Sequence, residues 1–122
     1  MSGRPRDREP EMLHGDVQRE TTRHLTPETG LPQHVSLYRI APGGTCTFHV
    51  HTGKTETWLV IDGEGEARVG ARHIPVASGD MVVTEPGTPH GLTNRGSGPL
   101  RFVNIVAADN REAISTTEVE TE

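Results

Sequence analysis

The middle of the chain alternates between hydrophobic and polar residues, and each alternating stretch ends at a turn signal. Such alternation is typical of strands with one buried face. The stretch 34–40 is closed by Pro42-Gly43-Gly44, and 55–61 runs into Asp62-Gly63, a hairpin-type dipeptide. Eight strands are predicted in this way: 34–40, 45–51, 55–61, 64–69, 72–76, 81–85, 90–94 and 100–107. With no convincing helix, the sequence predicts an all-β sandwich or small barrel, most commonly an eight-stranded jelly roll.

The two ends of the chain lack this alternation. Residues 1–33 are polar and are predicted to be a mobile leader that ends in a short edge strand near 17–24. Residues 109–122 are interpreted in the same way, as an acidic tail. The predicted domain is therefore 34–108, although either end could become ordered against a second subunit.

Composition narrows the class of protein. The 122 residues are only 31% hydrophobic and allow one domain. No apolar run approaches the roughly 20 residues that cross a bilayer, and no secretory signal is visible, so we expect a cytoplasmic protein without membrane contact. A single cysteine, Cys46, excludes a disulfide framework and a cysteine-based zinc finger.

The net charge of −5 is concentrated in the tail, which carries five acids and one arginine. Residues 34–108 hold equal numbers of basic and acidic residues, so no basic face is available for nucleic acid. Because the core is small and has few aromatic residues, burying one sheet face against a second copy would add stability. We therefore expect a homodimer.

Three histidines and one glutamate carry the candidate chemistry. His49 and His51 lie two residues apart on a predicted strand, so their side chains point to the same face. Glu56 follows the Thr52-Gly53 turn, and an antiparallel return would bring its carboxylate beside both imidazoles. His90 comes from a further strand, after the rigid Pro86-Gly87-Thr88-Pro89 turn. Three imidazoles and a carboxylate are ligands that suit a divalent first-row metal.

The glycines around these residues make the pattern specific. The spacing Gly43-x5-His49-x-His51-x4-Glu56-x6-Gly63 resembles the first signature of the cupin superfamily. The spacing Gly79-x5-Glu85-x-Gly87-x2-His90-x3-Asn94 resembles its second, except that Glu85 stands where the family usually has proline and Pro86 follows one place later. This departure affects the local turn and no proposed ligand.

The resemblance implies a small single-domain cupin, a double-stranded β-helix or jelly-roll barrel that is usually dimeric. It implies that His49, His51, Glu56 and His90 bind one divalent metal ion per chain, which would be iron, manganese, nickel or zinc. By strand parity, Trp58 and Val60 would line the pocket, and Leu92 and Phe102 are further candidates. Plain core packing is the alternative for these apolar residues.

Other residues receive simpler interpretations. Cys46 alternates to the face opposite His49 and His51 and is expected to be a small buried hydrophobe. Asn94 is expected to brace the backbone more readily than to touch substrate. Four histidines without such neighbours are expected to be ordinary solvated side chains: His14, His24, His34 and His73.

A cupin fold does not name a reaction. The leading hypothesis is a metal-dependent enzyme that acts on a small oxygenated molecule such as an enol, diketone, phenolic or hydroxy acid, with Glu56 as a ligand or a catalytic base. With iron, dioxygenase chemistry is favoured; with zinc, nickel or manganese, a non-redox isomerase or cyclase. A cupin that binds a small ligand without turnover is the alternative from another class. Only Arg39 and Arg101 could clamp a phosphosugar, which weakly disfavours sugar-phosphate isomerisation.

Overall fold

The computed structural model describes residues 12–21, 33–108 and 115–119, which form eleven strands and no helix. The strands are β1 (Met12–Leu13), β2 (Val17–Arg19), β3 (Gln33–Ile40), β4 (Thr45–Thr52), β5 (Lys54–Asp62), β6 (Glu64–Val69), β7 (Arg72–Ala77), β8 (Met81–Thr84), β9 (His90–Asn94), β10 (Leu100–Ala108) and β11 (Ser115–Glu118). The eight strands predicted from the sequence correspond to β3 to β10 within one residue at either end. The all-β prediction is confirmed. No helix in the described part of the chain has the length and hydrophobicity needed to cross a membrane.

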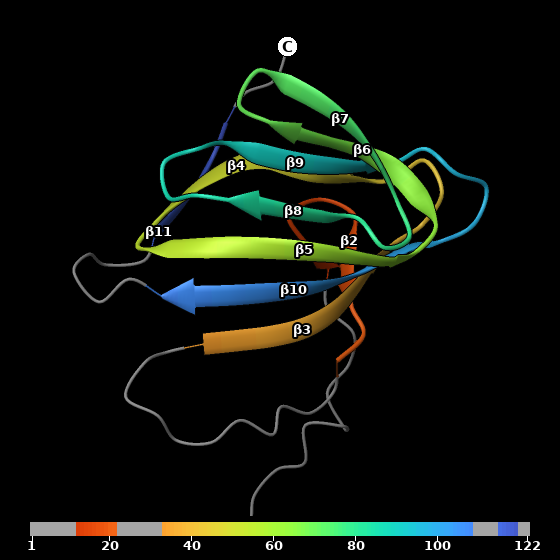
Figure 1. Cartoon of the computed structure of the whole chain (residues 1–122), viewed down its shortest axis with the longest axis horizontal. Coiled ribbons are helices and arrows are strands. Elements are labelled where there is room, and N and C mark those ends of the chain that lie inside the picture. The colour runs from red at the N-terminus through yellow and green to blue at the C-terminus, as the bar shows by residue number, and fades with distance from the viewer. Residues whose placement is uncertain (1–11, 22–32, 109–114, 120–122) are drawn as a thin grey trace, which may run out of the picture.

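The strands form two antiparallel sheets that face one another (Figure 1). The six-stranded sheet has the order β1-β2-β3-β10-β5-β8, and the five-stranded sheet has the order β11-β4-β9-β6-β7. Successive strands mostly change sheet along the chain, which is the jelly-roll arrangement that was predicted. Within the described ranges the two sheets do not close into one continuous barrel, and an isolated bridge between Gly15 and Cys46 links them at one edge.

The core lies between the sheets and is centred on β10. Ile40, Leu100 and Phe102 are almost completely buried. The Phe102 ring contacts Tyr38 on one side and Trp58 on the other, both edge to face, with ring centroids 5.7 and 5.8 Å apart. The Trp58 ring also meets His90 at 5.3 Å, so the aromatic core continues directly into the candidate ligands.

The outer face of the six-stranded sheet remains apolar. Val35, Ile61, Met81, Val83 and Ile105 are 38–61% exposed on this face, and we call them the apolar face. They come from β3, β5, β8 and β10, which are neighbours in the sheet. Ile105 lies opposite Val35 in the β10–β3 pair, so the patch is continuous across these two strands, and Thr57 lies between Ile105 and Val83.

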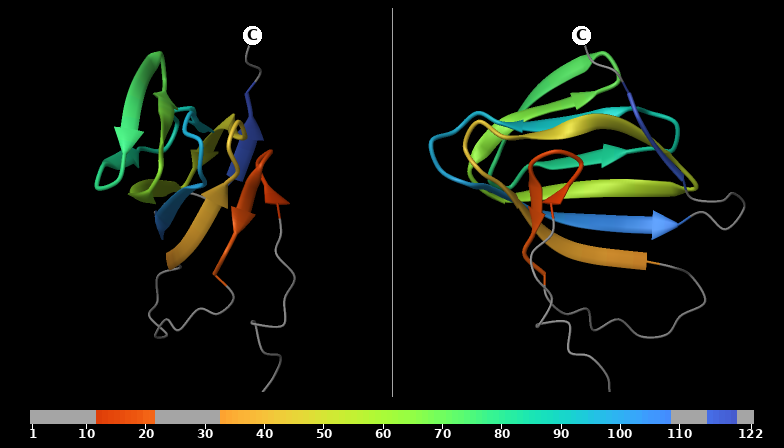
Figure 2. Two further views of the ribbon diagram at one scale, coloured as in Figure 1. Left: turned by 90° about the vertical axis from the view of Figure 1, so that its right-hand side faces the viewer. Right: turned by 180° about the vertical axis from the view of Figure 1, so that it is seen from behind.

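The two flanking segments contain more structure than the sequence pattern predicted. The expected edge strand near 17–24 begins with β2, whereas residues 22–32 lie outside the described residues. The short strand β1 precedes β2, and the acidic tail contributes β11, which pairs with β4. Residues 115–118 of the predicted acidic tail thus form a strand that the alternation pattern did not indicate. In Figure 2, β1 and β2 (red) and β11 (blue) lie on the same side of the molecule.

Candidate metal centre

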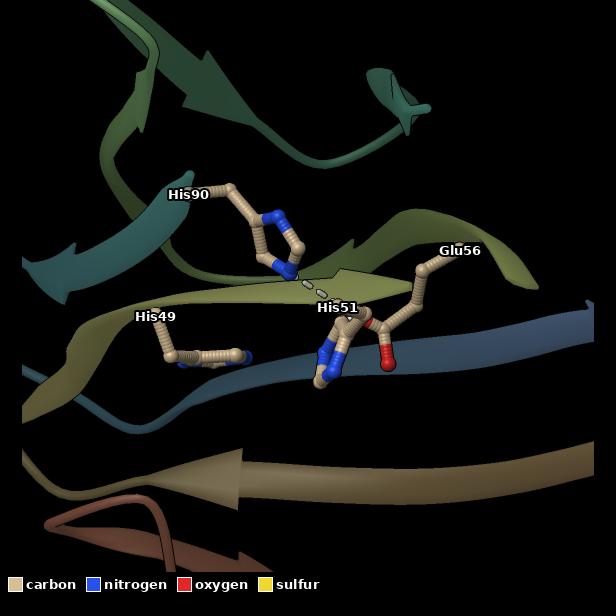
Figure 3. A group of neighbouring side chains, drawn as sticks. All are labelled: His49, His51, Glu56 and His90. Atoms are coloured by element: carbon tan, nitrogen blue, oxygen red, sulfur yellow. Dashed lines mark hydrogen bonds and ion pairs between the residues drawn. The ribbon is translucent and has the colours of Figure 1, made fainter. Parts of the chain in front are cut away.

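The four predicted ligands meet between the sheets. His49 and His51 extend from β4, Glu56 from β5 and His90 from the first residue of β9, and their side chains point toward one another (Figure 3). Each is at most 6% exposed. Their ligand atoms all lie within 4.8 Å of one another, so the group could hold a metal ion.

A β-bulge in β4 determines how the two histidines are presented. Phe48 and His49 are buried in succession, and the β4–β9 register shifts between Cys46 and His49. Cys46 therefore lies on the cavity side with His49, and the prediction that it faces the opposite side is wrong. The expectation of a small buried hydrophobe is confirmed, because Cys46 is 5% exposed and belongs to the core cluster. Burial raises the pKa of its thiol well above the usual value.

The turn before His90 adopts a regular conformation despite its unusual sequence. The Thr88 N–H donates to the Glu85 carbonyl at 3.1 Å, and Gly87 at the third position has φ of 86°. This is the geometry of a type II turn, in which proline at the second position is common. The Gly87 N–H also donates to the His51 carbonyl at 2.8 Å, which ties the turn to β4. The displaced Pro86 is therefore compatible with the placement of His90.

The outer nitrogens of two histidines are fixed by backbone carbonyls. His49 Nδ1 lies 2.7 Å from Thr47 O, and His90 Nδ1 lies 3.0 Å from Thr88 O. A carbonyl can only accept, so both Nδ1 atoms donate and each Nε2 is left as the nitrogen available to a metal.

The inner side of the group fits a metal ion. His90 Nε2 lies 3.0 Å from Glu56 Oε1. His51 Nε2 lies 3.3 Å from the same oxygen but is buried and has no hydrogen bond from the residues that the structure describes. Such a nitrogen is costly unless something binds it. A cation bound by three imidazole nitrogens and a carboxylate would satisfy it, and this donor set suits first-row divalent metals.

The protonation states of Glu56 and His49 also favour metal binding. Burial raises the pKa of Glu56, but the neighbouring His51 and His90 outweigh burial and hold this pKa well below the usual range. Burial, together with the nearby His14 and the other imidazoles, lowers the pKa of His49 to about 4. Glu56 is therefore ionised and His49 neutral near pH 7, the forms in which both bind metals.

A cavity of about 330 Å³ adjoins the group, and His49 and Glu56 form part of its wall. Trp58 and Phe102 line it, as does Tyr38. Val60 and Leu92 are instead packed in the hydrophobic core cluster.

Two cations and an amide also line the cavity: Arg19, Lys54 and Asn104. The sequence analysis did not single out these residues; it named Arg39 and Arg101 as the cations that could reach the pocket, and neither of them lines this cavity. Lys54 has the strand parity of Glu56, which is a signal that could have identified it. Arg19 lies in the polar leader, where the sequence offers little indication of which residues would be near the site.

His14 is the clearest departure from the sequence analysis. Its ring stacks on His49 with centroids 4.0 Å apart and planes inclined by 12°. Its Nδ1 lies 3.1 Å from Glu118 Oε2, and the side chain lines the cavity. The prediction of an ordinary solvated histidine is therefore wrong. The residues His14-Gly15-Asp16 indicate a turn, and His14 and Gly15 have φ of 47° and 89°, but nothing in the sequence places this turn beside His49.

The remaining predictions have simple outcomes. Asn94 braces the backbone as expected, because its Nδ2 donates to the carbonyls of Ile40 and Gly98, both at 2.9 Å. His73 is an exposed residue 3.6 Å from Glu66. His24 and the side chain of His34 lie outside the described residues.

Comparison with known proteins agrees with this geometry. The sequence profile of the cupin domain family matches residues 36–106. The oxalate-binding protein of Thermotoga maritima is 26% identical over 68% of this chain and 71% of that protein. Other curated relatives are mannose-1-phosphate guanylyltransferases, of which the chain spans 21% or less.

Solved structures are similar over most of the chain. The crystal structure of a predicted oxalate decarboxylase from Thermotoga maritima has a TM-score of 0.70 at 24% identity, covering 88% of this chain and 99% of that one. A double-stranded β-helix protein of Klebsiella pneumoniae has a TM-score of 0.68 at 28% identity, covering 91% of this chain and 90% of that one. From the profile match over more than half of its length, together with this fold, the chain belongs to the cupin domain family.

Proposed function

We propose that this protein is a metal-dependent enzyme that acts on a small oxygenated acid in the cavity beside His49 and Glu56. One observation carries this proposal: a buried group of three imidazoles and a carboxylate opens directly onto a cavity of about 330 Å³. Cavities of this size hold small molecules. A site at which a metal meets such a cavity is suited to binding and chemistry as well as to structural support.

The charges around the cavity favour an anionic substrate. Arg19, Lys54 and Glu56 are its charged lining residues apart from histidine. Glu56 would be engaged by the metal, and a ligand in the cavity would lie beside the two cations of its wall, Arg19 and Lys54. A carboxylate would complement them. The similarity to an oxalate-binding protein supports this substrate class.

Asn104 favours an acid that also carries a hydroxyl or enol. Its Nδ2 donates to Glu56 Oε2 at 3.2 Å, which fixes the amide orientation. Its Oδ1 is buried and has no hydrogen-bond partner in the described residues. A buried acceptor without a partner is costly, and a substrate O–H would satisfy it. A hydroxy acid or an enol-bearing acid therefore suits this wall better than a diketone does.

The reaction would divide between the metal and the protein. When bound, a divalent metal supplies Lewis acidity at the substrate oxygens and, if it is iron, access to dioxygenase chemistry. His49, His51, Glu56 and His90 would hold the ion, while Trp58 and Phe102 line the cavity and exclude water. Glu56, oriented by Asn104, would accept a proton from the substrate only where the substrate displaces it from the ion. A non-redox isomerisation or cyclisation is the second candidate for the same residues.

A panel of small acids tests the proposal. Metal-free protein is loaded in turn with Fe²⁺, Mn²⁺, Ni²⁺ or Zn²⁺, and consumption of two- to four-carbon hydroxy and keto acids is measured with and without O₂. Oxygen uptake would identify a dioxygenase, and conversion without oxygen would identify the non-redox reaction. Saturable binding without turnover would identify a binding module instead. The absence of both binding and turnover would overturn the proposal.

A matched pair of variants tests the substrate class. Lys54→Met removes a cation from the cavity wall, whereas Arg72→Met removes an exposed cation that is absent from the lining. We expect the first variant to weaken binding of the acids but not of their neutral methyl esters, and the second to change neither. Equal binding of acids and esters by the wild type would contradict an anionic substrate.

We also propose that the apolar face pairs two copies of the chain. Its five exposed residues carry no charge, and a two-fold axis would place each patch on itself. We expect Val83→Glu to convert a dimer into a monomer in sedimentation analysis, while Glu85→Gln, just beyond the end of β8, does not. A monomeric wild type at high protein concentration would refute this assembly.

A further inference from the structure

Among the three histidines, His51 has a different outer partner from the others. His49 and His90 each donate Nδ1–H to the backbone carbonyl two residues earlier in the chain. His51 Nδ1 instead lies 2.8 Å from the hydroxyl of Thr116, which is 65 residues away in β11. A carbonyl dictates the histidine tautomer because it only accepts, whereas a hydroxyl can donate or accept. The orientation of His51 therefore depends on a side chain from a separate strand.

The position of β11 is well determined by its contacts. It pairs with β4 in register, with Thr116 opposite His51 and Glu118 opposite His49. Glu118 reaches the His14 ring that stacks on His49, so the N-terminal turn and β11 together cover both ligands of β4. The Val119 N–H donates to the Phe48 carbonyl at 2.8 Å, which extends this pairing by one residue.

We propose that Thr116 is a positioning residue of the metal centre. Its hydroxyl accepts the Nδ1–H of His51 and so keeps Nε2 of that ring free of a proton and directed toward Glu56. Nε2 is the buried nitrogen for which the described part of the chain offers no hydrogen bond, and a metal ion requires its lone pair. A residue outside the cupin motif thus contributes to metal affinity without touching the metal.

A coupling follows from this arrangement. If pairing of β11 with β4 lets Thr116 hold His51 in the tautomer that binds metal, then metal binding must stabilise that strand pairing by the same free energy. We therefore expect the amides of β11 to exchange more slowly with deuterium in the metal-loaded protein than in the metal-free protein. The amides of β7, at the far edge of the same sheet, serve as the internal reference.

Three variants of the full chain test the proposal through Zn²⁺ affinity, measured by competition with a chelating indicator. Thr116→Val removes the hydroxyl and keeps the shape, Thr116→Ser keeps the hydroxyl, and Thr117→Val makes the same change at the next residue of the strand. We expect Thr116→Val to raise the Kd for Zn²⁺ about tenfold, in the range for lost outer partners of metal-binding histidines. The other two variants should stay within about twofold of the wild type.

A second readout separates positioning from a general loosening of the strand. In the Zn²⁺-loaded protein, the Nδ1–H proton resonance of His51 should move upfield in Thr116→Val, while those of His49 and His90 remain in place. Three results would overturn the proposal: unchanged affinity in Thr116→Val, an equal loss in Thr116→Ser or Thr117→Val, or equal shifts of all three resonances. Because neither readout uses a substrate, a failure to find turnover would leave this inference standing.

Discussion

The strands β3 to β10 and the flanking strands β1, β2 and β11 contribute to one site in different ways. The central strands supply all four candidate ligands from a rigid, buried framework. The flanking segments supply groups that contact those ligands, including His14 and Thr116, and one cation of the cavity wall, Arg19. A metal site can therefore be recognised from its central motif while its surroundings are assembled from segments that show little pattern.

Removing ligands from the central strands should produce the largest effect. We expect the double variant His49→Ala, His90→Ala to lose stoichiometric metal, because only His51 and Glu56 of the donor set remain. His14→Ala, the matched change in the flanking turn, should retain metal because its ring stacks on a ligand without belonging to the buried four. The metal content of each variant is measured by elemental analysis after purification without chelator. Circular dichroism checks that each variant is folded. Similar metal content in wild type and double variant would refute the assignment of the ligands.

Removing the N-terminal flank should have the next largest effect. Val17 on β2 is 2% exposed and belongs to the core, and Glu20 accepts two hydrogen bonds from Arg101. We expect deletion of residues 1–21 to cost at least about 2 kcal/mol more than deletion of residues 1–11, from the lost burial of Val17 alone. The comparison of the two truncations by urea denaturation isolates β1 and β2. Equal stability would mean that these strands add nothing to the core.

A single methyl group added at Gly65 on β6 tests how tightly the central strands are packed. A Cβ at Gly65 would collide with the Thr93 carbonyl oxygen and come within 2.8 Å of the Leu100 side chain. Gly65→Ala should therefore destabilise the fold by about 1–3 kcal/mol, the usual cost of overpacking. Gly98→Ala is the control, because nothing lies within 4 Å of the position that its added methyl group would take. The midpoints of thermal unfolding are measured for both variants, and equal midpoints would contradict this account.

The smallest effect should come from the ion pair that joins the flank to β10. Arg101 donates to both oxygens of Glu20 at 3.0 Å, and this contact lowers the pKa of Glu20 below its ordinary value of 4.5. A lowered pKa in the folded state stabilises the protein above the unfolded value, and the benefit is lost as the pH falls through the folded value. Glu20→Gln should therefore lower the Tm by at most a few degrees near pH 7, because the pair is partly exposed. The difference in Tm between the variant and the wild type should vanish in acid. A difference that grows below pH 4 would contradict a lowered pKa of Glu20.

Much of the fold was predictable because its signals are local. Alternation and turn dipeptides located β3 to β10, and the two-residue parity of strands placed His49 beside His51. The same parity argument failed at Cys46, because the bulge in β4 adds a residue that no local pattern reveals. Parity also assigned Val60 and Leu92 to the inner face. It could not show that the cavity ends before these positions, where both side chains pack in the core.

The flanking strands were less predictable for a physical reason. β1 and β2 have two and three residues, which is too short for a hydrophobic period. β11 consists of Ser115, Thr116, Thr117 and Glu118, and it owes its strand form to backbone pairing with β4 rather than to an apolar face. His14 and Thr116 acquire their roles only through partners far away in the sequence.

The order in which the chain is synthesised gives the contact between His51 and Thr116 a further consequence. All four candidate ligands exist once His90 has been added, yet β10, which flanks the strand of Glu56, and then Thr116 are still to come. The most recently added residues are shielded inside the ribosome, so His90 becomes accessible to metal ions only when β10 and most of β11 have also been synthesised. The complete donor set and the partner of His51 therefore become available to metal ions at nearly the same stage. The choice of metal then belongs to the folded site, and the cellular metal pool that matters is the one encountered once these strands have paired.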